Sequence, residues 1–193
     1  MYYNNEISKI RQIKSNIGQL LKPFHDYICE MENNKNWILT QGSISIKNSA
    51  EKHLATIYHI GDKGIEEKFG QLIQWANKKR LTNNSNFKMG TIYYDSYKMT
   101  SADKVRKNAF FLLESPVKKD NTIIPKSIPS GKFIIANIEL SVEEFSKAWR
   151  GLFNWMNENG FSKRDAPAFE IYHNNFNDHP EKKCLVDLFI PIM

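Results

Sequence analysis

Hydrophobic residues recur every three or four positions across residues 4–33, the first patterned region of the chain. They are Ile7, Ile10, Ile13, Ile17, Leu20, Leu21, Phe24 and Ile28. This period predicts an amphipathic helix, with Pro23 as the point where it would bend. The sequence leaves three roles open for the helix: packing on the rest of the protein, contact with a second copy, or the remainder of a linker. Residues 1–40 are therefore predicted to form an N-terminal helix and its connection.

Beyond that helix the same pattern occurs twice, which indicates an internal duplication. Six pairs of residues match at a separation of 80: Ile44 and Ile124, Phe69 and Trp149, Leu72 and Leu152, Trp75 and Trp155, Asn77 and Asn157, Leu81 and Phe161. After a loop shortened by two residues, Tyr94 matches Tyr172 and Phe111 matches Phe189 at a separation of 78. Each half reads as two strands, one helix and two more strands. We expect an α+β fold of two pseudo-symmetric modules, about 43–116 and about 122–193, in one domain spanning 41–193.

The helix of the second half has both of its ends marked in the sequence. Ser141 and Glu144 form a capping box, and Gly160 occupies the position where a left-handed residue ends a helix. Its apolar stripe is Phe145, Trp149, Leu152 and Met156, and the first half repeats it after residues 61–64 as Ile65, Phe69, Leu72 and Ala76. Both stripes predict core packing. Trp75 and Trp155 fall beside the stripes and suit an edge, an interface between the modules or the wall of a ligand site.

Alternation along the strands places an unexpected carboxylate on an aromatic face. Glu170 and Tyr172 share one face of their strand, and at a separation of 78 they correspond to Ile92 and Tyr94. The last strand adds Asp187 and Phe189 to the predicted aromatic face. Because strands disfavour carboxylates, Glu170 either lines a site or pairs with a lysine at the sheet surface.

Two equivalent modules leave a cleft between them, and an aromatic cleft with an acid suits a flat or cationic organic molecule. The candidate ligand-binding residues are Glu170, Tyr172, Tyr94, Trp149, Trp155, Phe111, Phe189 and Asp187. An enzyme is the alternative, with Glu170 as general acid or base and Tyr172 beside it, because an apolar pocket raises the pKa of a carboxyl group.

Composition narrows the class of protein further. The 193 residues are 41% hydrophobic and 12% aromatic, which indicates a globular domain, and no apolar run approaches the roughly 18 residues of a membrane span. The start of the chain lacks the pattern of a signal peptide, so the cytoplasm is expected, with Cys29 and Cys184 as reduced thiols. The net charge of +6 is spread along the chain, so no direct contact with DNA or membrane is expected.

Known motifs for cofactors and metals do not occur in the chain. His173, His179 and Glu170 follow no standard ligand spacing, and His173 lies on the opposite strand face from Glu170. Neither a metal site nor a cofactor is expected.

Four segments of the second half resemble the gyrase-inhibitor-like family, also called the AraC-type effector-binding domain. These segments are Gly131–Ala136, Trp149–Trp155, Pro167–Tyr172 with its Phe-Glu-Ile-Tyr motif, and Val186–Ile192 with its Ile-Pro-Ile ending. Residues 53–61 of the first half fit the family more loosely, so the resemblance covers about residues 43–193. It implies a duplicated, SHS2-like pair of modules around an aromatic ligand cleft.

The resemblance also implies a function for the carboxylate. In that family a pocket glutamate, here Glu170, faces bulky and often cationic aromatic compounds. Some stand-alone relatives hydrolyse cyclopropane-bearing genotoxins with such a glutamate and a neighbouring aromatic hydroxyl, others sense effectors for a DNA-binding region, and others inhibit DNA gyrase. The N-terminal helix is too short to be the usual DNA-binding module and the loop at residues 96–106 is unusually polar, which favours a stand-alone binding protein with a gyrase or homodimer contact as a further expectation.

Overall fold

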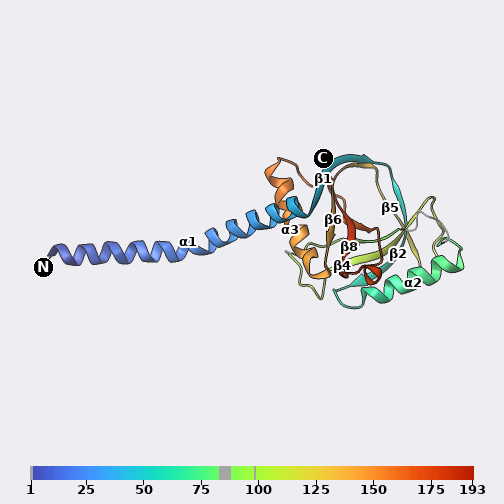
Figure 1. The fold of residues 1–193 in the computed structure, drawn as a ribbon, viewed down its shortest axis with the longest axis horizontal. Coiled ribbons are helices and arrows are strands. Elements are labelled where there is room, and N and C mark those ends of the chain that lie inside the picture. The colour runs from blue at the N-terminus through green and yellow to red at the C-terminus, as the bar shows by residue number, and fades with distance from the viewer. Residues whose placement is uncertain (1, 83–87, 98) are drawn as a thin grey trace.

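The computed structural model describes residues 2–82, 88–97 and 99–193, with side chains from residue 11 onward (Figure 1). The first module contains strands β1 (Gly42–Ser49) and β2 (Lys52–Ile60), helix α2 (Ile65–Lys78), and strands β3 (Met89–Tyr93) and β4 (Arg106–Leu113). The second module contains β5 (Ile124–Ile128), β6 (Gly131–Leu140), the 3-10 turn η1 (Val142–Glu144), α3 (Phe145–Glu158), β7 (Ala168–Tyr172), the 3-10 turn η2 (Phe176–Asp178) and β8 (Cys184–Ile192). Helix α1 (Tyr2–Gln41) precedes both modules. The predicted α+β fold is confirmed.

One antiparallel sheet of eight strands runs through both modules in the order β1-β6-β8-β7-β3-β4-β2-β5. Strands β3 and β7, one from each module, pair at the middle of the sheet. The first strand of each module pairs with the other module, because β1 lies along β6 and β5 lies along β2. The two modules have therefore exchanged their first strands.

Helices α2 and α3 both cover the same face of the sheet, each over its own module. Under α3, apolar residues of β6 and β8 surround Leu152, and under α2, residues of β2 and β4 surround Leu72; both leucines are fully buried. Seven strands contribute to a third cluster on the other face, where Phe133, Phe169 and Phe189 pack together. Since residues from β2 through β8 meet there, the sheet curls around this aromatic cluster.

The ends of the two covering helices follow the sequence signals. Ser141 and Glu144 form the predicted capping box, in which the backbone N–H of Ser141 donates to the Glu144 carboxylate at 2.9 Å. Gly160 has φ 74° after α3, and Gly64 has φ 85° before α2, both in the left-handed region that favours glycine.

Helix α1 continues through Pro23 and packs on the body only with its last turns. There Ile38 is fully buried and Lys35 pairs with Glu158 of α3 at 2.6 Å. Gly151 of α3 allows this approach, because a Cβ at that position would lie 2.4 Å from the backbone oxygen of Asn34. The rest of α1 projects away from the body, as Figure 1 shows. The apolar row that was expected to pack, Ile13 to Ile28 in its described part, is instead at least half exposed, and the packing against the body is made by residues 31–38 that follow it.

The register of the central strands corrects the repeat by one residue. Thr91 is directly opposite Glu170 in the β3–β7 pair. On their other sides, Thr91 pairs with Ala109 of β4 and Glu170 pairs with Leu188 of β8. Equivalent strand positions of the two modules are therefore 79 residues apart. The predicted matches of Ile92 with Glu170, Tyr94 with Tyr172, and Phe111 with Phe189 are wrong, because each pair lies on opposite faces of the sheet. The same shift replaces Ile124, which is 41% exposed, by the buried Ile123 as the counterpart of Ile44.

Candidate functional site

Glu170 lies at the centre of β7, on the face that α2 and α3 cover, and is only 1% exposed. The alternative that it pairs with a lysine at the sheet surface is therefore wrong. Its direct neighbour across the strand pair is Thr91, also 1% exposed. A carboxylate is rarely buried this deeply unless its oxygens have hydrogen-bond donors.

Three side chains donate hydrogen bonds to the Glu170 carboxylate. The hydroxyl of Tyr93 donates to Oε1 at 2.8 Å, the hydroxyl of Tyr172 donates to the same oxygen, and the indole Nε1–H of Trp149 donates to Oε2 at 3.2 Å. Thr91 extends the chain by donating to the Tyr172 hydroxyl at 2.9 Å. The carboxylate is thus held by one residue from α3 and by tyrosines from both central strands.

Aromatic rings from both covering helices enclose these donors. The ring of Tyr172 meets Phe69 of α2 and Phe145 of α3 edge-to-face, at centroid distances of 5.8 and 6.4 Å. The ring of Tyr93 meets Trp149 edge-to-face at 5.8 Å. The site therefore lies between α2 and α3, above the strand pair where the two modules join, and aromatic side chains fill the space around the carboxylate.

Burial raises the pKa of Glu170 above its ordinary value, although the hydrogen bonds from Tyr172, Tyr93 and Trp149 and the charge of Lys107 favour the ionised form. Burial, followed by the neighbouring carboxylate, likewise raises the pKa of Tyr93 and of Tyr172, so both hydroxyls keep their protons. A carboxyl group with a raised pKa between two protonated tyrosines is suited to binding a cation or to exchanging a proton.

A buried lysine with its own ion pair borders the site. Lys107 of β4 is directly opposite Tyr93, is 5% exposed, and lies 3.1 Å from the Asp62 carboxylate and 3.1 Å from the Tyr97 hydroxyl. Tyr97 also donates to Asp62 at 2.5 Å, and its ring meets that of Tyr93 edge-to-face at 6.0 Å. Asp62 comes from the loop before α2 and Tyr97 from the loop after β3, so these two loops close over one end of the site.

The structure brings together three of the eight residues predicted for the ligand site: Glu170, Tyr172 and Trp149. Phe111 shares the same face but packs under α2, and Trp155 stacks on Phe161 at a centroid distance of 6.2 Å. The other three lie on the opposite face: Tyr94, Phe189 and Asp187. Asp187 is 2.8 Å from His173 there and accepts a hydrogen bond from Asn137 at 2.7 Å.

Sequence reasoning missed Tyr93, Thr91, Lys107, Asp62 and Tyr97. Alternation groups Thr91 with Tyr93 on the strand face opposite to Ile92 and Tyr94, and matching the halves at 78 put Ile92 and Tyr94 on the Glu170 face in their place. Only the strand register, in which Thr91 is opposite Glu170, shows that Thr91 and Tyr93 share the face of Glu170. Lys107 and Asp62 come together through the fold, and no local signal in the sequence connects them.

The described parts of the chain contain no group of three or more histidine, cysteine, aspartate or glutamate side chains that could hold a metal ion. Within the same described parts, no helix is both long and apolar enough to cross a bilayer.

The buried carboxylate and its aromatic neighbours thus lie where the two duplicated modules join. The chain belongs to the GyrI-like family: the family described as "GyrI-like small molecule binding domain" matches residues 43–193. This confirms the resemblance drawn from the Phe-Glu-Ile-Tyr and Ile-Pro-Ile segments.

Individual relatives share little sequence identity with this chain. DNA gyrase inhibitor 2 of Dickeya dadantii (strain 3937) is 26% identical over 113 residues, which are 57% of this chain and 70% of that protein. Among solved structures, EcmrR in a complex with DNA has a TM-score of 0.63 at 13% identity, covering 98% of this chain and 70% of that one. A hydrolase from Listeria innocua has a TM-score of 0.57 at 9% identity, covering 78% and 92%. At these identities the solved structures show a shared fold alone.

Proposed function

We propose that this GyrI-like domain binds a bulky aromatic cation between α2 and α3, with Glu170 as the counter-charge. The observation that carries the proposal is the carboxylate itself, 1% exposed and enclosed by Tyr93, Tyr172 and Trp149. Ring faces attract cations, and a buried carboxylate that lacks an equal positive partner gains most from a ligand that brings one.

The charges near the site favour a single positive charge on the ligand. Glu170 and Asp62 are acidic, and Lys107 is the basic residue that pairs with Asp62 at 3.1 Å. Lys107 is thus already matched, which leaves the charge of Glu170 in excess. A ligand with one positive charge would therefore bring the total charge of Glu170, Asp62, Lys107 and the ligand to zero.

Ligand entry requires a change in the side chains around Glu170, because they fill the space in this structure. Trp149 makes the longest of the three bonds, at 3.2 Å, and its side chain on α3 is partly exposed. We propose that the ligand displaces this indole and takes its place against Glu170, while the two tyrosines keep holding the carboxylate.

Titration with rhodamine 6G, followed by tryptophan quenching and dye anisotropy, tests the proposal. Glu170→Gln should weaken binding of the cationic dye by at least about tenfold, which corresponds to about 1.4 kcal/mol. It should leave binding of the uncharged aromatic probe N-phenyl-1-naphthylamine nearly unchanged. Asp187→Asn is the matched control, since it removes a carboxylate from the opposite face of the sheet. Equal dye affinity in wild type and Glu170→Gln would remove Glu170 from the ligand role.

A hydrolase is the second candidate function, because Glu170 combines a raised pKa with the adjacent hydroxyl of Tyr172. In this role Glu170 would take a proton from water as the water oxygen bonds to a carbon of a strained cyclopropane; the ring C–C bond at that carbon would break, and its electron pair would stay on the rest of the ligand and be protonated there. Tyr172 would hold the carboxylate in place. Product formation beyond one equivalent per protein, lost in Glu170→Gln, would support an enzyme. Purely stoichiometric protection would favour a binding protein.

Inhibition of DNA gyrase is the third candidate, motivated by the 26% identity to DNA gyrase inhibitor 2 over 113 residues. A supercoiling assay with purified gyrase tests it directly. Unchanged supercoiling at a large molar excess of the protein would count against this function.

A further inference from the structure

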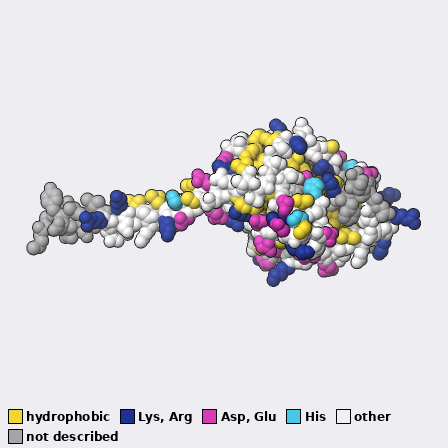
Figure 2. Space-filling model, viewed as in Figure 1, with side chains coloured by type: hydrophobic (Ala, Val, Ile, Leu, Met, Phe, Trp, Pro, Cys, Tyr) yellow, Lys and Arg dark blue, Asp and Glu magenta, His cyan; other side chains and the backbone are white. Residues whose placement is uncertain are grey.

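We infer that the projecting part of α1 is a self-association surface, which pairs antiparallel with α1 of a second copy of this chain. Its starting observation is a row of large apolar side chains that the body of the protein does not cover. Leu20 is 71% exposed and Phe24 69%, and Ile13, Ile17, Leu21 and Ile28 are each at least half exposed. Figure 2 shows hydrophobic side chains along this projecting segment, beyond the body of the protein.

The row has the spacing of a two-helix seam and continues an interface that already exists in the fold. Ile13, Ile17, Leu20 and Phe24 follow one another at steps of four, three and four, and Met31 and Ile38 continue at steps of seven. Ile38 is fully buried against α3, and Met31 is partly buried beside it. The same face of α1 therefore packs on α3 near the body and is exposed farther out, where a second helix would continue the packing.

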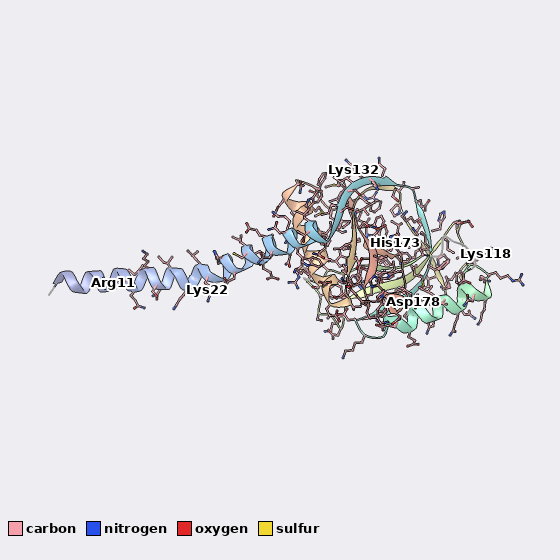
Figure 3. The ribbon with its side chains drawn as sticks, viewed as in Figure 1. Arg11, Lys22, Lys118, Lys132, His173 and Asp178 are labelled. Carbon is pink, nitrogen blue, oxygen red and sulfur yellow. The ribbon has the colours of Figure 1, made fainter. Side chains whose placement is uncertain are left out.

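The charges along α1 select the orientation of the partner. Between residues 11 and 22 the charged side chains are Arg11, Lys14 and Lys22, all basic, whereas between residues 26 and 32 they are Asp26, Glu30 and Glu32, all acidic. Figure 3 shows Arg11 and Lys22 on the projecting segment, away from the body. An antiparallel pair places each basic segment beside the acidic segment of the other copy. A parallel pair would align like charges and bring both bodies to the same end.

The composition of α1 also indicates that it needs a partner. Pro23 and Gly18 lie in its interior, and such residues cost about 3 and about 1 kcal/mol relative to alanine in an exposed helix. A helix with these residues gains most of its stability from packing of its apolar face. A second copy supplies that packing with matched spacing and opposite charge.

The first test is the molar mass of the full chain in solution, measured by light scattering and sedimentation over a concentration series. We expect a dimer in wild type and a monomer in the double variant Leu20→Glu, Phe24→Glu. Ser15→Glu with Gln19→Glu adds the same charge to the other side of the helix and should remain dimeric. A wild-type monomer at all concentrations, whether or not it then binds anionic phospholipid vesicles, would overturn the proposal. Near-ultraviolet circular dichroism reports whether the body stays folded in each variant.

Disulfide formation tests the orientation. In a Cys29→Ser background, chains carrying Ile13→Cys are mixed with chains carrying Ile28→Cys and oxidised under mild conditions. Antiparallel pairing predicts mixed disulfide dimers of the two chains, because residue 13 lies near residue 28 of the other copy. Dimers linked between two Ile13→Cys chains would show parallel pairing and overturn the antiparallel arrangement. Raised salt should weaken the wild-type dimer, since the opposed charges attract.

Discussion

The hydroxyl of Tyr93 donates a hydrogen bond of 2.8 Å to Glu170, and the two residues come from different halves of the internal duplication. The carboxylate of the second module is thus positioned partly by the first. Where the second module has Glu170, the first has Thr91 at the corresponding position, and Thr91 supports the site by donating to Tyr172. The two modules therefore differ in sequence where they join, and one acidic residue, Glu170, accepts hydrogen bonds from tyrosines of both modules.

Tyr93→Phe should make Glu170 harder to ionise. The hydrogen bond from Tyr93 favours the charged carboxylate, so its loss moves the pKa of Glu170 further upward. Affinity for a cationic dye should then fall by about tenfold near pH 6, as expected for one hydrogen bond to a charged group. Dye titrations from pH 5 to 8 provide the measurement. Tyr58→Phe is the control, because Tyr58 is 44% exposed and lies on β2 away from the site; a pH profile of Tyr93→Phe that matches wild type would contradict the prediction.

The free energy of unfolding should depend on pH through Glu170. Because burial raises the pKa of Glu170 in the folded state, the folded protein holds this proton more tightly than the unfolded chain, whose glutamates titrate near about 4.3. The contribution of Glu170 to stability is therefore fully present below that pH and is lost as the pH rises through the raised, folded-state value. Urea unfolding of wild type and Glu170→Gln between pH 4 and 8 measures it. The stability of wild type relative to Glu170→Gln should decline as pH rises, and a constant or increasing difference would argue against the raised pKa.

Asp62→Asn and Lys107→Met should change cation affinity in opposite directions. Asp62→Asn leaves the charge of Lys107 unmatched beside the site, so dye affinity should fall by about fivefold, or about 1 kcal/mol. Lys107→Met removes a positive charge that repels the ligand and should raise the affinity by a similar factor, measured at a pH at which Glu170 is ionised in both proteins, because Lys107 also favours the ionised carboxylate. The two variants are compared at low salt and at high salt, where both effects should shrink. Changes of the same sign in both variants would show that structural damage, rather than charge, controls binding.

Gly151→Ala should destabilise the protein by about 1–3 kcal/mol, the range expected for overpacking. A Cβ at Gly151 would approach the backbone oxygen of Asn34 to 2.4 Å, so α1 would have to move away from α3. Gly70→Ala in α2 is the matched control: a Cβ there would have no other group within 4 Å, and the change should stabilise the helix by about 0.5–1 kcal/mol. Thermal and urea unfolding measure both. Equal effects of the two substitutions would contradict the close approach of α1 to α3.

The sequence was sufficient for the helices and the duplication. Their signals are local: a stripe such as that of Leu152 and Met156 repeats within one helix, and the Ser141–Glu144 capping box lies within four residues. Glu170 was also identified correctly as an unusual residue, because a carboxylate in an apolar strand stands out in any register.

The partners of Glu170 were less predictable for a physical reason. Side chains alternate faces along a strand, so matching the halves at 78 instead of 79 exchanged Tyr93 for Tyr94 and brought Asp187 and Phe189 to the wrong side. The strand pairs β1–β6 and β2–β5 are long-range contacts with no signature in the local pattern. For helix α1 the local signal was sufficient for the helix itself, because its apolar period predicts it. Only the structure shows which part of its apolar face packs on the body and which part stays exposed.

The exchanged first strands restrict how a ligand can reach Glu170. Strand β1 of the first module is hydrogen-bonded to β6 of the second, β5 of the second is hydrogen-bonded to β2 of the first, and β3 joins β7 between them. Moving the two modules apart would break backbone hydrogen bonds in all three strand pairs at once. We therefore expect the sheet to stay rigid, so that access to the carboxylate depends on the groups that cover it: the rotation of side chains such as Trp149 and the movement of the loops that carry Asp62 and Tyr97.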